Sequence, residues 1–376
     1  MHMLKRLELK GYKSIKEASL ELRPLNVFIG ANGSGKSNLV SFFNLLNHMM
    51  TGNLQGFVAT SGGAHSLLHY GAKLTPQMEA TLRFGPSTAD FEYWMRLDHA
   101  AEDTLILDER IAIREQHFRG PSIDKLGAGH KETKLKLVVP DPNDEWEAVR
   151  GEVKVAFGLM LDQCRVFQFH DTSSTSNMRQ NGDINRNRLL ESDGGNLAAV
   201  LYKIQQTAPD CYQRIVGTIR QIAPFFDNFN LAPSELNPNV IQLRWRERDR
   251  DYDFGPHLLS DGTLRAMALV TLLLQPVKDL PSIIIIDEPE LGLHPYALAT
   301  LAGLLQSASV HSQIIVATES ATLLDHFEPE DVVVTERCKG ETVFKRLDSK
   351  DLQEWREEYT LSELWDKNVI GGRPSR

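Results

Sequence analysis

Short runs in which hydrophobic and polar residues alternate dominate the beginning of the chain. Residues 4–10 and 18–22 follow the period of two that places one face of a strand against a core. Residues 25–29 form an apolar run that enters a glycine-rich turn, and residues 37–49 then carry apolar side chains at helical spacing. The pattern predicts two half-exposed strands, a buried strand, a turn and a helix.

Alternating segments return between residues 78 and 160, where polar loops separate them. The segments are residues 80–84, 104–107, 111–113 and 134–139. Alternation of this kind is typical of antiparallel strands that pack one face and expose the other. We therefore expect an antiparallel sheet built mainly from residues 78–160.

The middle of the chain changes to helical spacing. Residues 189–222 follow it, and Pro209 divides them into two helices. Beyond them, residues 241–248 predict one strand of a hairpin with charged outer positions. Its arginines either contact nucleic acid or pair with the acidic residues interleaved among them, and pairing is the simpler interpretation.

The clearest buried strand lies in the last third of the chain. Residues 283–286 are all isoleucine, as expected for a strand that is covered on both faces. Residues 313–317 form a second apolar strand, and residues 296–308 between them have helical spacing. This βαβ unit predicts a parallel sheet, preceded by an apolar helix at residues 264–274 and followed by a hairpin at residues 332–344.

The composition agrees with an ordinary globular protein. The 376 residues are 41% hydrophobic and 24% charged, and the formal net charge of −9 does not by itself indicate nucleic-acid binding. The longest apolar run is too short for a membrane span, and the N-terminus lacks a signal-peptide pattern. Cys164, Cys211 and Cys338 are scattered, and we expect reduced thiols. We therefore expect a cytoplasmic protein without a membrane partner.

The turn after the first apolar strand reads G-A-N-G-S-G-K-S, which fits the Walker A pattern. Its glycines let backbone N–H groups wrap around phosphates, and the following helix adds its positive N-terminal end. Lys36 is expected to reach the β- and γ-phosphates of ATP, and Ser37 to ligate Mg²⁺. The nucleotide-binding residues predicted from this motif are Asn32, Gly33, Ser34, Gly35, Lys36, Ser37 and Asn38.

Two acidic residues follow the isoleucine strand, in the manner of a Walker B motif. Because successive strand residues point to opposite sides, Asp287 can face Mg²⁺ while Glu288 faces the attacking water as general base. The predicted catalytic residues are therefore Glu288 and Lys36, and the predicted metal ligands are Ser37 and Asp287.

A second glycine-containing turn, L-S-D-G-T, precedes the apolar helix at residues 264–274. The Ser260 hydroxyl, the Gly262 N–H and the helix N-terminus form a second surface suited to phosphate. The alternative is a plain N-cap, in which Ser260 or Asp261 only satisfies the helix start. A monomer with one ATP needs a single phosphate site, so the second site predicts a partner subunit.

These motifs, with I-I-I-I-D-E-P-E-L-G-L-H-P and V-A-T-E-S, resemble the SMC/RecF branch of ABC-type ATPases. More narrowly, the chain resembles stand-alone bacterial AAA-family ATPases related to RecF and to the ATPase half of OLD-family nucleases. The resemblance implies an α/β P-loop head of the ABC type with a central, mostly parallel sheet, an antiparallel side sheet and a helical lobe. The expected parts are a Walker A lobe (1–50), the side sheet (78–160), the helical lobe (185–225), a signature and Walker B lobe (254–347) and a tail (348–376).

The resemblance also implies a homodimer that holds ATP between its subunits. Ser260 and Gly262 of one subunit would bind the γ-phosphate that Lys36 of the other holds. His294 would lie close to the partner's site, although a loop histidine with a structural role is an equally good interpretation. A loop that contacts Mg²⁺ and γ-phosphate is also implied.

The loop that the family places at Mg²⁺ is less plainly matched in this sequence. Gln168 is the residue type that usually makes this contact, and His170 and Asp171 are the alternatives. An ordinary turn after a strand explains the same residues equally well.

One position departs from the family pattern. Where relatives place a histidine or glutamine that senses the γ-phosphate, this chain has Glu319. A carboxylate repels the γ-phosphate unless it is protonated, bound to Mg²⁺ or turned away. Either Thr318 or Ser320 therefore does the sensing, or hydrolysis is slow.

Two functions are consistent with these motifs. The first is Mg²⁺-dependent ATP hydrolysis in a dimer, coupled to DNA or to an effector protein in DNA repair or anti-phage defence. The second is a slow or non-hydrolysing, ATP-gated scaffold that holds or releases a separate nuclease. The residues after Ser320 show no paired-acid motif of a Toprim nuclease, so we expect any nuclease to be another chain. A transporter subunit is disfavoured because the signature lacks the usual glutamine.

Overall fold

A six-stranded, mostly parallel sheet forms the centre of the computed structural model, which describes residues 3–85, 89–115, 122–135, 158, 161 and 163–373. Neighbouring strands are parallel in every pair except β16 and β17, which are antiparallel. The strands lie in the order β17 (Glu341–Arg346), β16 (Val332–Cys338), β3 (Leu25–Ile29), β15 (Gln313–Thr318), β14 (Ile283–Asp287) and β8 (Cys164–Phe167).

A second six-stranded sheet is antiparallel throughout. Its order is β2 (Ile15–Glu21), β1 (Leu4–Tyr12), β4 (Gln77–Phe84), β5 (Ala89–Ala100), β6 (Thr104–Glu115) and β7 (Ser122–His130). Besides the segments between residues 78 and 160, it takes in the first two strands of the chain, with Leu7 opposite Leu82. The strand expected at residues 134–139 falls partly outside the described residues, and its first two residues form a bend and a turn.

Helix α1 (Lys36–Thr51) lies between the two sheets. Its apolar residues share one core with the antiparallel sheet and with Ile283 and Ile285 of β14. Ile284 and Ile286, the alternate residues of the same strand, belong to the core on the other face of the central sheet. This alternation explains why the strand is entirely apolar: both of its faces are covered.

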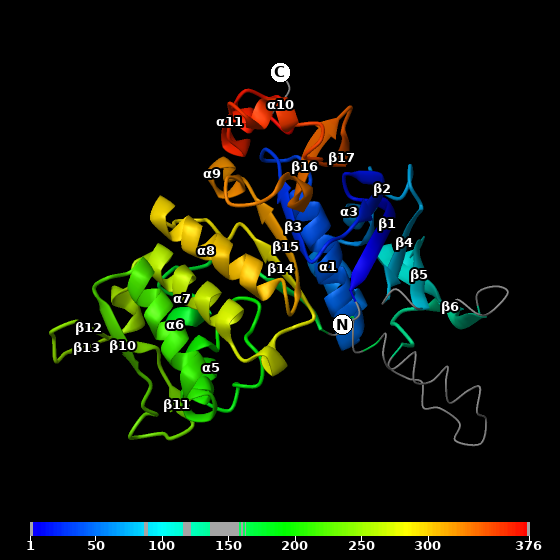
Figure 1. Cartoon of the computed structure of the whole chain (residues 1–376). Coiled ribbons are helices and arrows are strands. Elements are labelled where there is room, and N and C mark those ends of the chain that lie inside the picture. The colour runs from blue at the N-terminus through cyan, green and yellow to red at the C-terminus, as the bar shows by residue number, and fades with distance from the viewer. Residues whose placement is uncertain are drawn as a thin grey trace.

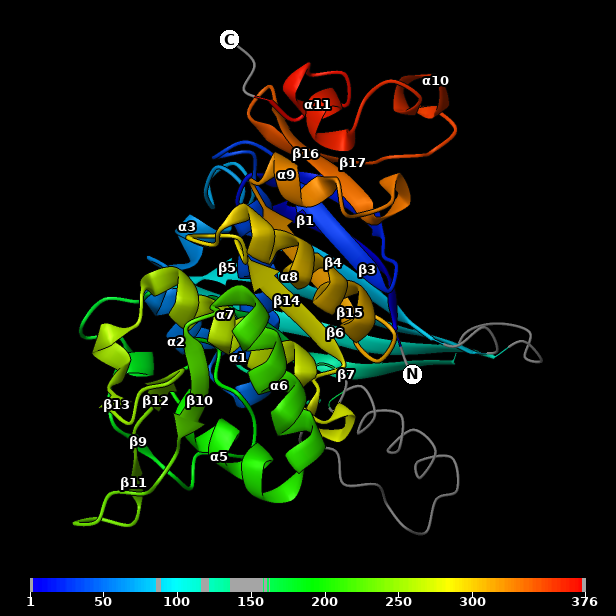
Figure 2. The same cartoon turned by 60° about the vertical axis from the view of Figure 1, so that its left-hand side comes forward.

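The other face of the central sheet carries a helical lobe, which appears in green and yellow in Figure 1. Its helices are α5 (Leu197–Thr207), α6 (Pro209–Ile222), α7 (Asp261–Leu274) and α8 (Pro295–Ala308). A small sheet of β10 (Phe226–Asn230), β12 (Arg244–Glu247) and β13 (Asp253–Phe254) borders them. Figure 2 shows these elements in front of the central sheet.

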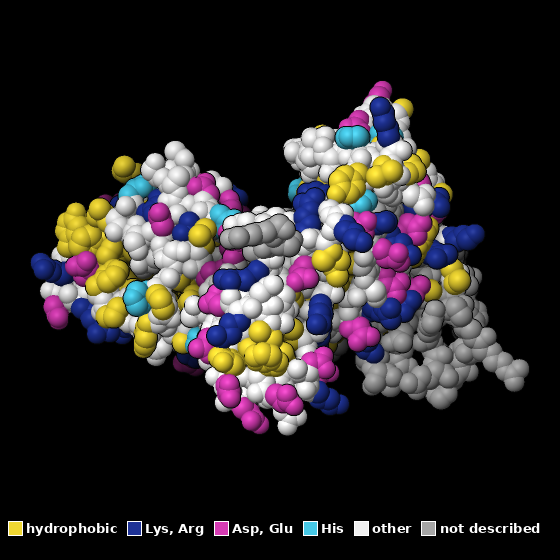
Figure 3. Space-filling view, turned by 90° about the horizontal axis from the view of Figure 1, so that it is seen from above, with side chains coloured by type: hydrophobic (Ala, Val, Ile, Leu, Met, Phe, Trp, Pro, Cys, Tyr) yellow, Lys and Arg dark blue, Asp and Glu magenta, His cyan; other side chains and the backbone are white. Residues whose placement is uncertain are grey.

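The arginine-rich strand predicted at residues 241–248 corresponds to β12. Arg246 forms an ion pair with Asp253 of the neighbouring strand at 2.5 Å. This hydrogen bond lowers the pKa of the Asp253 carboxyl. At Arg246, therefore, the structure shows the acidic pairing that was the simpler interpretation of this stretch. On the face seen in Figure 3, basic and acidic side chains are interspersed.

The C-terminal segment returns to the loop after β3. The Ala31 N–H donates to the carbonyl of Gly372 at 3.0 Å. Gly372 has a φ of 86°, and a Cβ there would overlap the ring of Trp365. A larger residue is therefore excluded by both backbone and space. The short elements of the described residues are α2 (Leu54–Thr60), α3 (Ala64–Leu67), α9 (Ala321–Leu324), α10 (Gln353–Arg356), α11 (Leu361–Asp366), β9 (Gly182–Asp183) and β11 (Val240–Ile241).

No helix in the described part of the chain has both the length and the apolar character that crossing a bilayer requires.

Candidate nucleotide site

The Walker A loop joins the buried strand β3 to helix α1. No side chain caps the start of α1, so its first N–H groups remain available to an anion. Gly35 has a φ of 116°, in the region that favours glycine, and a Cβ there would overlap the Thr342 side chain. The Thr342 hydroxyl also donates to the Ser34 carbonyl at 2.9 Å. The β16–β17 hairpin, at the edge of the central sheet, therefore supports the Walker A loop.

The Lys36 ammonium is buried in this loop. It donates to the carbonyls of Gly30 at 2.6 Å and Ala31 at 3.1 Å. Its third contact is the Glu319 carboxylate, at 3.3 Å. An ammonium has three donors, so the protein satisfies all of them here. The Glu319 side chain is 32% exposed, whereas that of Lys36 is only 5% exposed.

Asp287 ends strand β14 and has one oxygen without a protein partner. Its Oδ2 accepts from the Gln168 amide at 3.0 Å, while Oδ1 is buried and makes no hydrogen bond to the described residues. Burial raises the pKa of Asp287, and Gln168, His170 and Lys36 oppose that rise. A divalent cation would supply the missing partner and favour the charged carboxylate.

The residues present fit Mg²⁺ rather than a metal held by protein ligands alone. Within the described ranges, no three His, Cys, Asp or Glu side chains group in a way that would hold a metal. Ser37 is exposed at the start of α1, and Asp287 supplies the orphaned oxygen. Mg²⁺ usually takes one or two protein oxygens and completes its shell with phosphates and water. Bound there, it would neutralise phosphate charge.

Glu288 follows Asp287 with an unusual backbone. Its φ is 46°, which is left-handed for a residue that is not glycine. Its N–H donates to the Ala317 carbonyl at 2.7 Å, which ties it to the neighbouring strand. The side chain is 30% exposed. The strand therefore ends at Asp287, and Glu288 begins the segment that follows it with a left-handed backbone.

Sequence reasoning missed Glu290, which organises the loop after β15. One carboxylate oxygen of Glu290 accepts from the Thr318 hydroxyl at 2.6 Å, from the Glu319 N–H at 2.9 Å and from the Ser320 N–H at 3.2 Å. Burial raises the pKa of Glu290. The sequence feature that could have indicated Glu290 is its position as a third acidic residue, two positions after Glu288. Glu290 fixes the backbone that presents Glu319 to the Walker A lysine.

The segment after β8 places the three candidate residues of this loop in different surroundings. Gln168 contacts the Asp287 carboxylate, and His170 Nε2 lies 3.0 Å from the Asp287 carbonyl oxygen. Asp171 instead accepts from the N–H of Ser173, and hydrogen bonds from Ser173 lower the pKa of Asp171. Gln168 and His170 thus lie at the Walker B residues, and Asp171 belongs to a turn.

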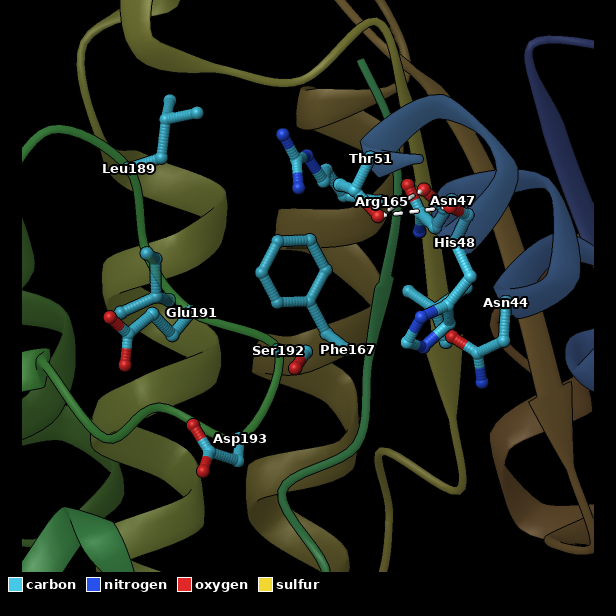
Figure 4. A pocket seen from close by; sticks show the side chains of 12 residues that line it. Asn44, Asn47, His48, Thr51, Arg165, Phe167, Leu189, Glu191, Ser192 and Asp193 are labelled. Carbon is cyan, nitrogen blue, oxygen red and sulfur yellow. Dashed lines mark hydrogen bonds between the residues drawn. The ribbon is translucent and has the colours of Figure 1, made fainter. Parts of the chain in front are cut away.

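A cavity of about 460 Å³ lies beside this segment. Figure 4 shows the Phe167 ring between Glu191 on one side and Asn47 and His48 on the other. None of its lining residues was predicted as part of the site.

The second glycine turn forms the start of helix α7. The Ser260 hydroxyl accepts from the Thr263 N–H at 3.2 Å, so Ser260 is an N-cap. A Cβ on Gly262 would overlap the Gly292 carbonyl, which explains the need for glycine. Ser260 is exposed, and in the described ranges its side-chain bonds go only to Thr263. The cap is therefore present, and a hydroxyl remains at the surface.

A buried arginine holds this turn in place. Arg179 donates to the Thr172 carbonyl at 2.8 Å and to the Leu259 carbonyl at 3.2 Å. It also contacts Pro256 and pairs with Asp261 at 2.8 Å. A buried guanidinium with several oxygen acceptors fixes a loop rigidly. The turn before α7 is thus positioned relative to the segment after β8.

His294 caps the next helix, α8. Its Nδ1 accepts from the Tyr296 N–H at 3.3 Å, and the residue is exposed. This contact gives His294 a structural role within the chain.

Two family models match the chain in separate segments. "AAA ATPase domain" matches residues 3–75, and "AAA domain, putative AbiEii toxin, Type IV TA system" matches residues 166–325. A protein of Methanosarcina acetivorans named "Putative ABC transporter ATP-binding protein" is 30% identical over 109 residues, 28% of this chain and 38% of that protein. The replication and repair protein RecF of Acidothermus cellulolyticus is 58% identical over 38 residues, 10% of each chain.

Solved structures of SMC heads resemble nearly the whole chain. An Smc head bound to the C-terminal winged-helix domain of ScpA has a TM-score of 0.59 at 16% identity, covering 93% of this chain and 99% of that one. An Smc head with an extended coiled coil, bound to the C-terminal domain of ScpA from Pyrococcus furiosus, has a TM-score of 0.54 at 14% identity, covering 95% and 99%. Because these sequence identities are low, the structural similarity establishes the fold and nothing beyond it. By sequence the chain is thus similar to AAA-type ATPase domains, to an ABC-type ATP-binding protein and to a segment of RecF, and its fold is that of an SMC head.

Proposed function

We propose that this protein hydrolyses ATP with Mg²⁺ in a dimer and couples that cycle to DNA or to an effector protein. The observation that supports it most is the buried, unpartnered Asp287 oxygen at the sheet edge where the Lys36 loop begins. Strands β3 and β14 flank β15 in parallel, so their carboxyl ends meet at that edge. A triphosphate bound by the Lys36 loop would bring Mg²⁺ to Asp287 and leave Glu288 free to activate water.

The exposed signature turn supports a dimer. Ser260 caps helix α7 and is exposed, and within the described ranges its hydroxyl bonds only to Thr263. A second copy placed head-to-tail would bring this turn to the ATP held by Lys36. The SMC heads that resemble the fold are bound to ScpA fragments. We therefore propose that this chain also works with a separate protein, such as a nuclease in defence or repair.

Replacing Ser260 with arginine is expected to leave ATP binding by the monomer within about twofold and to prevent ATP-dependent dimerisation. The long cation would fill the space meant for the partner's γ-phosphate, although it leaves the Lys36 loop unchanged. Mass photometry with and without ATP, in a Glu288→Gln background, measures the effect. Ser307→Arg, on the exposed side of α8, is the matched control. If Ser260→Arg forms as much ATP-dependent dimer as Ser307→Arg does, the turn at Ser260 does not bind the partner's ATP.

The contact between Glu319 and Lys36 favours the second candidate, an ATP-gated scaffold that hydrolyses slowly. The carboxylate occupies a donor of the ammonium that a phosphate would use, and it repels the nucleotide. A protein with this arrangement binds ATP despite the repulsion between the Glu319 carboxylate and the phosphates. Turnover, unlike binding, is therefore the property that separates the two candidates.

Glu319→Gln is expected to tighten ATP binding about threefold to fivefold, since a partly exposed ion pair is worth up to about 1 kcal/mol. The amide keeps the shape of the side chain and removes its charge. Titration with a fluorescent ATP analogue measures affinity, and phosphate release measures turnover. Glu328→Gln, at another exposed ion pair, is the control. Weaker binding by the Glu319 variant would show that the carboxylate helps the nucleotide, for example through Mg²⁺.

A further inference from the structure

An imidazole lies next to the proposed general base, and it comes from the segment after β8. His170 Nε2 is 3.9 Å from the Glu288 carboxylate and 3.0 Å from the Asp287 carbonyl oxygen. In the described part of the chain, no other histidine comes within 4 Å of that carboxylate. The loop after β15, by contrast, presents Glu319 to Lys36.

We propose that His170 is a positioning residue that holds Glu288 for the attack of water on ATP. The proposal rests on the ATP hydrolysis proposed above and adds a role for a residue outside the Walker motifs. His170 acts through the Asp287–Glu288 peptide and takes no proton from the substrate.

The first step of the argument is the direction of the hydrogen bond. A carbonyl oxygen only accepts, so the His170 Nε2 must carry the hydrogen that it donates to Asp287. This bond fixes the peptide plane that precedes Glu288. The Glu288 N–H in the same plane donates to Ala317. The peptide is thus held from both sides.

The second step is the strain in the backbone of Glu288. A φ of 46° is unfavourable for a residue with a side chain, and it persists only where the surroundings impose it. The bonds from His170 and to Ala317 are two such constraints. If the His170 bond is lost, the peptide can rotate toward an ordinary conformation. The carboxylate would then move relative to the nucleotide.

The third step is the support of His170 itself. Arg265, on helix α7, donates to the carbonyls of Phe169 at 2.9 Å and His170 at 2.8 Å. The same guanidinium donates to the Leu291 carbonyl at 3.2 Å, in the loop that follows Glu288. One side chain therefore holds both segments that meet at the general base. Because Ser260 caps α7, the base is also positioned relative to the surface that would meet the partner.

The kinetic test compares His170→Ala with His170→Gln in the full chain. His170→Ala is expected to lower kcat about 30- to 100-fold and to change KM for ATP less than threefold, because misplacing a catalytic group impairs chemistry more than binding. A glutamine N–H can replace the bond to the Asp287 carbonyl, so His170→Gln is expected to have a higher kcat than His170→Ala. The recovery is expected to be at least one third of the decrease in log kcat that alanine causes. His311→Ala, at an exposed loop after α8, is the control.

Two kinetic results would overturn the proposal. One is a rise in KM with unchanged kcat, which would make His170 a binding residue. The other is a glutamine variant no better than alanine, which would require the imidazole itself. Thermal unfolding of each variant shows whether it is folded. If His170→Ala does not fold, comparison of His170→Gln with the wild type still tests the proposal.

A second measurement is independent of turnover. Side-chain ¹⁵N NMR of the wild type, assigned by the signal lost in His170→Gln, reports which nitrogen carries the hydrogen. A hydrogen on Nε2 is expected, and a neutral ring with hydrogen only on Nδ1 would overturn the proposal whatever the activity. A wild type that binds ATP, shows the Nε2 hydrogen and hydrolyses nothing would instead refute the proposed ATPase function and, with it, the role of His170 in it.

Discussion

Lys36→Ala is expected to weaken ATP binding by at least about 100-fold, or roughly 3 kcal/mol, which is the scale of a hydrogen bond to a charged group. The ammonium is the buried cation of the Walker A loop. Its removal takes a hydrogen bond from each of the Gly30 and Ala31 carbonyls, and the Glu319 carboxylate then faces the phosphates without a counter-charge. Isothermal titration with a non-hydrolysable ATP analogue measures the loss.

The control for this variant distinguishes the loss of the Walker A lysine from the loss of a positive charge elsewhere on the protein. Lys345→Ala removes a lysine from the exposed side of β17 and should bind ATP like the wild type. The circular dichroism spectrum of Lys36→Ala should remain native, because the lysine belongs to the loop and not to either core. ATP affinity within threefold of the wild type would mean that the phosphates are held elsewhere.

Glu288→Gln is expected to keep ATP binding within about threefold and to slow phosphate release by at least about 100-fold. The amide matches the shape of the carboxylate, but it cannot accept the proton of the attacking water. The Asp287 ligand and the Lys36 loop are untouched. Since ATP then persists, the dimer should accumulate with nucleotide bound. Phosphate release and mass photometry on the same sample measure both effects.

Glu354→Gln, on the exposed helix α10, is the matched control and should cleave ATP like the wild type. Turnover of Glu288→Gln at the wild-type rate would exclude Glu288 as the general base. Loss of both binding and turnover would show instead that Glu288 supports the fold of the site. Proteins that co-elute with the trapped dimer would then be candidates for the proposed effector.

Much of the fold follows from local patterns in the sequence. The isoleucine strand at residues 283–286 is apolar on both faces, and the structure covers both. Helix α1 begins at Lys36, directly after the last glycine of the Walker A loop. The glycines at 35 and 262 were expected from their motifs, and each stands where a Cβ has no room. These features depend on neighbouring residues, so periodicity and turn chemistry were sufficient to predict them.

The partners of the site residues were decided by the tertiary structure. The sequence showed that Glu319 departs from the family pattern, but only packing shows that it bonds to Lys36. Gln168 and His170 meet Asp287 across 119 and 117 positions of the chain. No periodic pattern encodes such contacts, because they depend on which strands lie side by side in the sheet and on how the loops are held.

What the sequence alone determined, then, was the chemistry of each motif: a phosphate-binding loop, a pair of acids after a buried strand and a serine-led turn before a helix. The tertiary structure decided their surroundings. It placed β8 next to β14, which brings His170 to the Walker B residues. It also brought Gly372 back to the Walker A loop. Local spacing fixes the conformation of a segment, whereas the approach of distant segments depends on how the whole core packs.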